Sequence, residues 1–220
     1  MKILIVSGFL GAGKTTFIKR LARNVDQRFA ILENEYGAAG IDGARLGQNR
    51  QGTQKNVWEM TEQCICCIGK KDFAASVLTI ANVVDPEYLI VEPTGVGSLA
   101  RIIENLRQIE YERIQLLSPV TIVDVYSYRR YMAEYPELYQ DQIRSADTII
   151  VSKTEACQAE EKQRIQKFLQ EINSQAKIIT DYASTMTRED YQSLLLGSRY
   201  EKKVQDTQSG EKMPETFSFE

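Results

Sequence analysis

The sequence predicts an α/β fold in which a mostly parallel sheet carries helices on both faces. Short apolar runs alternate along the chain with longer segments whose apolar residues recur at helical spacing. A glycine-rich turn separates the first apolar run from the first helical segment. The composition, with 43% apolar and 26% charged residues, is typical of a globular protein. Strands linked by helices in this way are expected to form right-handed crossovers and parallel pairs.

Six short apolar runs have the length of buried strands. From the N terminus they are Ile3–Val6, Phe29–Leu32, Tyr88–Val91, Val120–Val123, Thr148–Val151 and Lys177–Ile179. Two intervening segments place apolar residues at positions i, i+3, i+4 and i+7, which lie on one helix face. They are Leu99, Ile102, Ile103 and Leu106 in one segment, and Ile165, Phe168, Leu169 and Ile172 in the other. We expect each stripe to pack against the sheet.

Two polar segments interrupt this alternation. Residues Tyr36–Thr61 contain several glycines, and we expect a long loop there, which in a compact domain is usually functional or mobile. Residues Gly197–Glu220 form a polar tail whose last residues, Phe217–Glu220, alternate like the start of a strand. The expected organisation is one domain over residues 1–196 followed by a tail over residues 197–220.

Composition excludes several classes of function. A net charge of −3 over 220 residues disfavours nucleic acid as the main partner, because phosphate backbones need a clustered positive surface. No apolar run approaches the roughly 20 residues of a membrane-spanning helix, and no convincing signal-peptide cleavage site follows the apolar start. We therefore expect a cytoplasmic protein with no membrane partner. The absence of histidine excludes Ser-His-Asp and Cys-His mechanisms within the chain.

The strongest motif runs from Gly8 to Thr15 and fits the P-loop pattern G-x-x-x-x-G-K-[ST], which predicts a P-loop NTPase. Its glycines let successive N–H groups point at phosphate oxygens, and the following helix aims its positive end at the same anion. We expect Lys14 to reach the β- and γ-phosphates and the Thr15 hydroxyl to ligate Mg²⁺. The predicted nucleotide-binding residues of this segment are Gly8, Gly11, Ala12, Gly13, Lys14, Thr15 and Thr16.

A P-loop protein also needs an acid at a strand end to hold Mg²⁺ or its water. Glu92 and Asp124 each follow an apolar run and compete for this role. Generic P-loop proteins use aspartate, which favours Asp124. Gly95 favours Glu92, because a glycine there would let a backbone N–H approach a γ-phosphate closely. We favour Glu92 as the Mg²⁺ neighbour, with Gly95 as a nucleotide contact.

The segment Ser152-Lys153-Thr154-Glu155 follows a late predicted strand and resembles the guanine-recognition pattern Asn-Lys-x-Asp. The stem of Lys153 can lie on the base, and the carboxylate of Glu155 can accept hydrogen bonds from the guanine N–H edge. Ser152 lacks the amide that would brace neighbouring loops. GTP is therefore favoured over ATP, although a capped helix start is the plainer explanation of these four residues.

Three of the four cysteines fall in Cys64-Ile65-Cys66-Cys67, whereas Cys157 stands alone and is expected to be a small buried apolar residue. Thiols stay reduced in the cytoplasm, so a cluster indicates metal binding or chemistry rather than disulfides. Thiolates suit Zn²⁺ and similar ions, and three of them leave the fourth ligand open. A redox pair over Cys64-x-x-Cys67 and three unconnected cysteines remain as alternatives.

Taken together, these residues resemble the CobW (cobalamin synthesis protein-like) family of P-loop GTPases, which is similar to the nickel-enzyme maturation GTPases of urease and hydrogenase. The matching segments are Gly8–Thr16, Glu33–Gly37, Ile41-Asp42, Cys64–Cys67 and Glu92–Gly95, with Asp124 and Ser152–Glu155 in the expected order. The resemblance extends over about residues 1–179. The sequence departs from the family pattern at Gln63, Ser152 and Glu155. The family usually has a second, C-terminal domain, and we expect the tail over residues 197–220 to be a remnant of the linker to such a domain.

The resemblance implies a GTP-hydrolysing metallochaperone that delivers a transition metal, Zn²⁺ or Co²⁺, to a client metalloprotein or to cofactor maturation such as that of cobalamin. It assigns Cys64, Cys66 and Cys67 as metal ligands and Glu92 to the Mg²⁺ neighbourhood, beside the P-loop Lys14. Glu33 and Glu35 would add carboxylates or position the attacking water. No arginine finger or water-positioning glutamine is identifiable, so hydrolysis by the isolated chain is expected to be slow. A second copy of the chain, in a homodimer, is a further candidate partner. The alternative functions are a nucleotide-dependent regulatory switch for a partner protein without metal transfer, and a small-molecule kinase using ATP.

Overall fold

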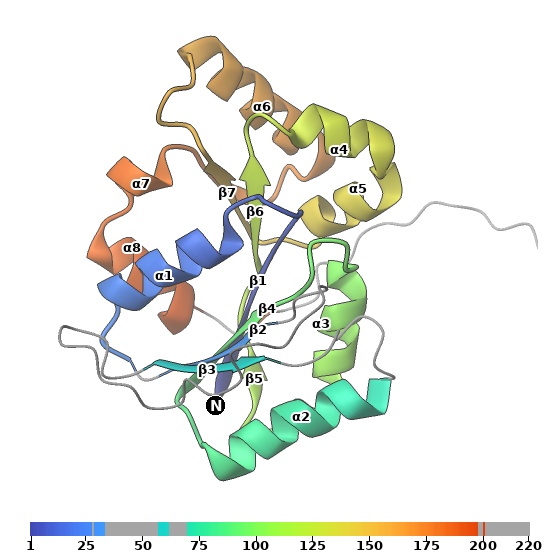
Figure 1. Cartoon of the computed structure of the whole chain (residues 1–220), viewed down its shortest axis with the longest axis vertical. Helices are drawn as coiled ribbons and strands as arrows, with labels where there is room; N and C mark the ends of the chain where they lie inside the picture. The colour runs from blue at the N-terminus through green and yellow to red at the C-terminus, as the bar shows by residue number, and fades with distance from the viewer. Residues whose placement is uncertain (28, 34–56, 62–69, 198–199, 201–220) are drawn as a thin grey trace, which may run out of the picture.

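A computed structural model of the chain describes residues 1–27, 29–33, 57–61, 70–197 and 200 (Figure 1). The strands are β1 (Lys2–Gly8), β2 (Phe29–Glu33), β3 (Val57–Thr61), β4 (Tyr88–Glu92), β5 (Gln115–Leu116), β6 (Val120–Asp124), β7 (Thr148–Ser152) and β8 (Lys177–Ile179). The helices are α1 (Lys14–Asn24), α2 (Lys70–Val83), α3 (Leu99–Arg107), α4 (Tyr128–Glu134), α5 (Pro136–Arg144), α6 (Ala159–Ile172), α7 (Tyr182–Thr185) and α8 (Arg188–Leu196).

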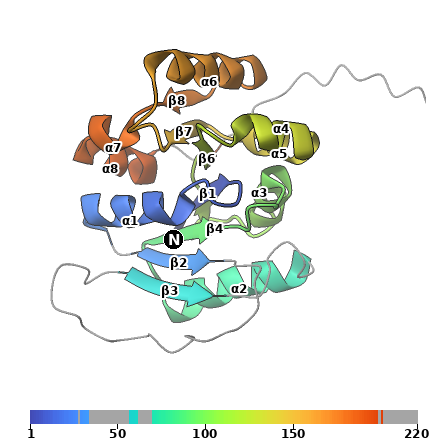
Figure 2. The ribbon, with the colours of Figure 1, turned by 45° about the horizontal axis from the view of Figure 1, so that its top comes forward.

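The described strands form one parallel sheet in the order β3-β2-β4-β1-β6-β7-β8, with the short β5 paired to β1 off this path. This confirms the predicted mostly parallel α/β architecture and all six predicted strands. Figure 2 shows the strands stacked in this order, with α1, α7 and α8 on one side and α2, α3, α4 and α5 on the other.

The two faces of the sheet follow from the alternation of side chains along each strand. In β1, Leu4 and Val6 belong to the core beneath α1, α7 and α8, whereas Ile3 and Ile5 belong to the core beneath α2 and α3. A third cluster of buried apolar residues lies beneath α4, α5 and α6. It extends the core under α2 and α3 toward β7. Parallel strands buried on both faces are continuous apolar runs, as observed here.

Both predicted helical stripes form helices that bury the expected residues. In α3 all four stripe residues are buried, and the Ser98 side chain caps the helix by accepting a hydrogen bond from the Arg101 N–H. In α6, Ile165 and Leu169 are fully buried, while Phe168 and Ile172 are half-buried at the edge of the third cluster. None of the helices in the described residues combines the length and apolar character that a membrane crossing requires.

The prediction of a loop over Tyr36–Thr61 is wrong at its end, because Val57–Thr61 forms β3. This strand lies at the edge of the sheet and pairs with β2 in parallel register, Val57 opposite Phe29 and Thr61 opposite Glu33. An edge strand has a single strand partner, so polar residues such as Glu59 and Thr61 are compatible with pairing. Because the segment is polar, the sequence did not predict this strand. Residues 34–56 of the expected loop lie outside the described residues.

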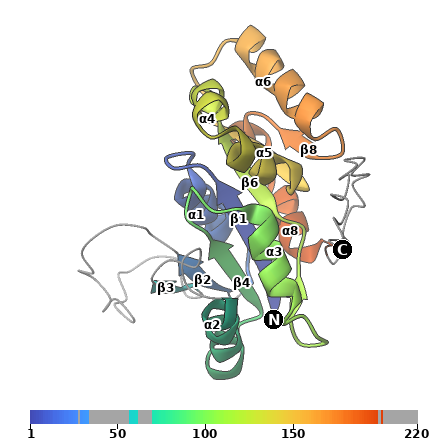
Figure 3. The same cartoon turned by 90° about the vertical axis from the view of Figure 1, so that its right-hand side faces the viewer.

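The sheet also places the P-loop at one end of its central strand. Figure 3 shows the N terminus at one end of β1 and the turn into α1 at the other.

At the C-terminal end of the described chain, α8 ends at Leu196, close to the predicted boundary. Beyond it, the Tyr200 N–H donates to the Leu116 carbonyl at 2.9 Å, so the start of the expected tail contacts the sheet. Residues 201–220 lie outside the described residues.

Candidate functional site

The P-loop is the turn between β1 and α1, and its glycines adopt backbone conformations that other residues avoid. Gly8, Gly11 and Gly13 have φ values of 143°, 71° and 99°. A Cβ on Gly8 would lie 2.4 Å from the Ile122 carbonyl oxygen, so β6 leaves no room for a side chain there. Gly13 precedes the first residue of α1, so the turn leads directly into a helix N-terminus suited to an anion.

Aromatic side chains fix this turn from the α4–α5 side. The ring of Phe9, in the turn, packs against Tyr131, Tyr135 and Tyr139 with centroid distances of 4.4, 5.5 and 5.4 Å. The Tyr131 hydroxyl donates to the Leu10 carbonyl at 3.0 Å. The turn is thereby held by a cluster that no sequence motif marks, because aromatic residues in α4 and α5 have no fixed spacing relative to the P-loop.

Lys14 folds back over the turn and is 8% exposed. Its Nζ donates to the Phe9 carbonyl at 3.4 Å and lies 4.0 Å from Oε1 of Glu92. A buried ammonium group needs such anionic or carbonyl partners. The same position suits a β- or γ-phosphate, which would supply stronger charge-assisted bonds.

Glu92, the last residue of β4, meets Thr15 in the first turn of α1. The Thr15 hydroxyl lies 3.0 and 3.2 Å from the two carboxylate oxygens of Glu92. A hydroxyl and a carboxylate at this separation are the hard oxygen ligands that Mg²⁺ prefers, and the phosphates would supply further oxygens. These residues therefore fit a bound Mg²⁺. The neighbouring Thr16 is exposed.

Asp124, the competing acid, has different partners. Its oxygens accept hydrogen bonds from the Tyr126 N–H at 2.9 Å, the Ser127 hydroxyl at 2.9 Å and the Lys153 ammonium at 2.7 Å. Burial by itself would raise the pKa of Asp124, but these three donors outweigh it and hold the pKa below the usual aspartate value. Asp124 is thus an ionised anchor for Lys153, and Glu92 is the acid beside Thr15.

The predicted base-recognition segment begins at the end of β7, next to the P-loop. The Ser152 hydroxyl donates to the Ala12 carbonyl at 2.6 Å, so the serine itself provides a brace to the P-loop that we expected to be lost. Lys153 has a left-handed backbone with φ of 60° and extends to Asp124. The Thr154 side chain is buried, whereas the Glu155 side chain is exposed to solvent.

Gly95, the expected nucleotide contact, lies directly on the P-loop backbone. A Cβ on Gly95 would lie 2.4 Å from the Leu10 nitrogen and 2.8 Å from the Leu10 Cα. The carbonyls of Gly95 and Gly97 accept hydrogen bonds from the side chain of Gln142 in α5. Gln142 was missed from the sequence because a lone glutamine in a helix carries no motif.

The predicted transition-metal residues Glu35, Cys64, Cys66 and Cys67 lie outside the described residues. Glu33 is the last residue of β2 and pairs in register with Glu92 on one side and Thr61 on the other. In the described part of the chain, no group of three or more cysteine, aspartate or glutamate side chains is placed to hold a metal ion. Cys157 is half-buried against the third core cluster rather than fully buried.

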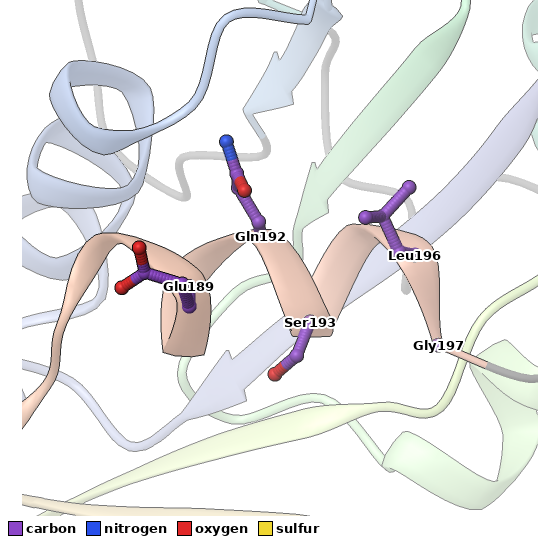
Figure 4. A pocket seen from close by; sticks show the side chains of 5 residues that line it. All are labelled: Glu189, Gln192, Ser193, Leu196 and Gly197. Atoms are coloured by element: carbon purple, nitrogen blue, oxygen red, sulfur yellow. The ribbon is translucent and has the colours of Figure 1, made fainter.

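An open depression of about 390 Å³ lies on α8, away from these motifs in the sequence. Figure 4 shows its lining, which consists of Glu189, Gln192, Ser193, Leu196 and Gly197 along the helix. It brings together none of the predicted site residues.

The chain is similar in sequence to several known proteins. A family model described as the CobW/HypB/UreG nucleotide-binding domain matches residues 2–180. The zinc chaperone YeiR of Escherichia coli K12 is 30% identical over 178 residues, covering 80% of this chain and 53% of YeiR. The zinc chaperone CobW of Pseudomonas aeruginosa is 27% identical over 209 residues, covering 81% of this chain and 56% of that protein. The chain therefore spans about half the length of these relatives.

Two solved structures share the fold. The Zn(II)-bound YjiA GTPase of Escherichia coli aligns with a TM-score of 0.62 at 22% identity, covering 85% of this chain and 58% of YjiA. The hydrogenase maturation factor HypB of Archaeoglobus fulgidus aligns with a TM-score of 0.57 at 17% identity, covering 89% of each chain. At these identities the comparison concerns the fold.

Proposed function

The chain belongs to the CobW/HypB/UreG family of nucleotide-binding domains, and we propose that it is a GTPase that couples GTP to the binding and delivery of a transition metal. The observation that carries the GTPase part is the contact of Thr15 with Glu92 beneath the glycine turn. That contact brings together a helix N-terminus, a buried lysine and the hard oxygen ligands of Mg²⁺ in one place.

Each residue then has a defined task. The N–H groups of the turn and Lys14 bind the phosphates. Thr15 and Glu92 would hold Mg²⁺, which would neutralise charge on the phosphates. Gly95 presents its N–H to the γ-phosphate. Glu33, at the neighbouring strand end, orients the attacking water. Because the sequence motifs include no identifiable arginine finger or water-positioning glutamine, we expect slow turnover by the isolated chain.

GTP is the proposed nucleotide. The Lys153 stem lies against the base, held by the ion pair of its ammonium with Asp124 at 2.7 Å. The exposed Glu155 accepts hydrogen bonds from the N–H edge of guanine. A site built to pair with these N–H groups rejects bases that lack them, because its own polar groups would be left unpaired.

The metal part of the proposal rests on relatives that are named zinc chaperones and on the order of strand ends. Glu92, Glu33 and Thr61 end three adjacent strands in register. Neighbouring strands lie about 4.8 Å apart, so Thr61 is about 10 Å from the Mg²⁺ side of the site. Cys64 follows Thr61 by three residues in the sequence. We propose that a γ-phosphate that reorders the ends of β4 and β2 changes the metal affinity of the cysteine segment, which follows β3 in the sequence.

The metal is the cargo rather than a resident cofactor. Cys64, Cys66 and Cys67 are its proposed ligands, with Glu35 as a candidate fourth, and zinc is favoured over cobalt by the names of the relatives. The client would be a metalloprotein or a protein of cofactor maturation, and a homodimer is a second proposed partner.

Nucleotide binding is tested with Lys14→Ala and a control, Lys19→Ala, at an exposed lysine of the same helix. We expect Lys14→Ala to weaken both GTP and GDP binding at least about tenfold, since it removes charge-assisted bonds to phosphate, and Lys19→Ala to leave binding unchanged. Fluorescent nucleotide titration measures both. Equal affinities of the two variants would refute the assignment of the site.

Base choice is tested by competition among GTP, ITP and ATP. ITP lacks the guanine 2-amino group, so the wild-type chain should prefer GTP over ITP, and Glu155→Ala should remove that preference. A preference for ATP, or phosphorylation of a metabolite at the expense of ATP, would favour the kinase alternative instead.

A further inference from the structure

Gln142 ties α5 to the segment that follows β4. This side chain is 1% exposed, and its amide nitrogen donates to the carbonyls of Gly95 at 3.1 Å and Gly97 at 2.9 Å. The two partners lie more than 40 positions earlier in the chain. One buried side chain of α5 thus holds two carbonyls of the turn that follows β4.

The turn held by Gln142 is the one that contacts the phosphate site. It starts at Glu92, whose carboxylate meets Thr15, and continues to Gly95, which lies so close to Leu10 that a Cβ would come within 2.4 Å of the Leu10 nitrogen. A hydrogen bond from the Gly97 N–H to the Thr94 carbonyl closes the turn. The turn is therefore packed between the P-loop on one side and α5 on the other.

Gln142 is itself held in place. The Thr121 hydroxyl of β6 donates to the Gln142 backbone carbonyl at 2.9 Å. The preceding residue, Asp141, accepts a hydrogen bond from the Ala100 N–H at 3.3 Å, at the start of α3. Gln142 and Asp141, two consecutive residues of α5, thus bind two carbonyls and one N–H group within residues 95–100. This part of α5 is itself hydrogen-bonded to β6 of the central sheet.

Packing alone does not account for an amide at this position. No described residue donates a hydrogen bond to the Gln142 Oε1, which is buried. A buried acceptor without a partner costs free energy, whereas an apolar side chain of similar volume would leave the Gly95 and Gly97 carbonyls without this donor. The amide at this position therefore acts on the turn through its two donor hydrogens.

We propose that Gln142 is a positioning residue for γ-phosphate recognition, acting through the carbonyls of Gly95 and Gly97. By holding these carbonyls, it keeps the Gly95 backbone against the P-loop, where the γ-phosphate of GTP would meet the Gly95 N–H. GDP has no γ-phosphate, so Gln142 supports GTP binding and contributes little to GDP binding. This inference rests on the proposed GTPase function.

The test compares Gln142→Leu with wild type, using a non-hydrolysable GTP analogue with Mg²⁺ and, separately, GDP. Leucine keeps most of the volume and removes both donors. We expect the affinity for the analogue to fall about tenfold, the equivalent of one to two hydrogen bonds, and the affinity for GDP to stay within about twofold. Gln142→Met is the second variant, and it should behave in the same way.

Asn173→Leu is the matched control. Asn173 is also a buried amide, and its nitrogen donates to the carbonyls of Ile143 at 2.8 Å, in the last turn of α5, and Ala146 at 2.9 Å, just beyond the helix. The Asn173→Leu substitution should lower the melting temperature without changing the ratio of the affinity for the GTP analogue to the affinity for GDP.

Three results would overturn the proposal. Equal losses of affinity for both nucleotides, or no loss for either, would show that Gln142 acts on packing alone, and so would failure of both Gln142 variants to fold. A wild-type chain that binds neither nucleotide would instead refute the GTPase function itself, and this inference with it.

Discussion

Two carboxylates at strand ends, Glu92 and Asp124, compete for the Mg²⁺ position in the sequence and have different neighbours in the fold. Glu92 meets a hydroxyl of the P-loop helix, whereas Asp124 is surrounded by three donors, one of them an ammonium group. A carboxylate whose lone pairs are already engaged is a poor metal ligand. The sequence identified both candidates and favoured Glu92 on account of Gly95, and the structure adds that the oxygens of Asp124 are engaged by their own donors.

Asp124→Asn should destabilise the protein in a pH-dependent way. Because the pKa of Asp124 is held below its usual value, the stabilising effect of its charge is fully present above about pH 4 and is lost as the pH falls through the lowered pKa. The difference in free energy of unfolding between wild type and Asp124→Asn should therefore shrink on acidification. Urea titrations over a pH series measure it.

Asp26→Asn serves as the control for this prediction. Asp26 is paired with Arg188 at an exposed site, where ion pairs contribute little. Its substitution should cost little stability at any pH. If the difference in free energy of unfolding between wild type and Asp124→Asn were the same at neutral and acidic pH, the result would contradict the role given to the Asp124 charge.

At the scale of elements, sequence periodicity predicted every long buried strand and both amphipathic stripes, because apolar runs and helical spacing report burial directly. It missed β3, whose edge position tolerates polar residues, and β5, whose two residues are too short for a pattern. At the site, the P-loop and the strand-end acids were predictable since their chemistry fixes their spacing. The contacts of Gln142 and of Tyr131 depend on how α4 and α5 pack, which no local pattern encodes.

The brace between β7 and the P-loop is another contact of this kind. The Ser152 hydroxyl donates to the Ala12 carbonyl at 2.6 Å, joining the base segment to the phosphate turn. Ser152→Ala should lower stability by about 1 kcal/mol and weaken binding of GTP and GDP alike, since the buried carbonyl loses its partner. Thermal melts and nucleotide titrations check both effects.

Ser193→Ala is the matched control for the brace. Its hydroxyl donates to the Asp190 carbonyl at 2.7 Å within the exposed face of α8. Water can replace that bond, so we expect no change in nucleotide affinity and a smaller change in stability. Nucleotide affinities that fall equally in the two serine variants would refute the special role of Ser152.

At the scale of the whole molecule, the parallel sheet gathers its candidate functional residues at the carboxyl ends of its strands. These ends lie together in a parallel sheet, so Gly8, Glu33, Glu92, Asp124 and Ser152 come together from across the chain. The order β3-β2-β4-β1 places the strand that precedes the three clustered thiols two positions from the strand that carries Glu92. The proposed coupling of nucleotide and metal binding rests on this order of adjacent strands.

The central claim is that GTP and metal binding are coupled, and it is tested by titrating the reduced wild-type chain with Zn²⁺ in the presence of Mg²⁺ and either a non-hydrolysable GTP analogue or GDP. We predict zinc affinities that differ at least about fivefold between the two nucleotides, with a reciprocal effect of zinc on nucleotide affinity. Thiolate absorption with Co²⁺ as a probe should report Cys64, Cys66 and Cys67 as ligands. Identical zinc affinities with both nucleotides, or zinc binding unchanged when the three cysteines are replaced by serine, would contradict the claim.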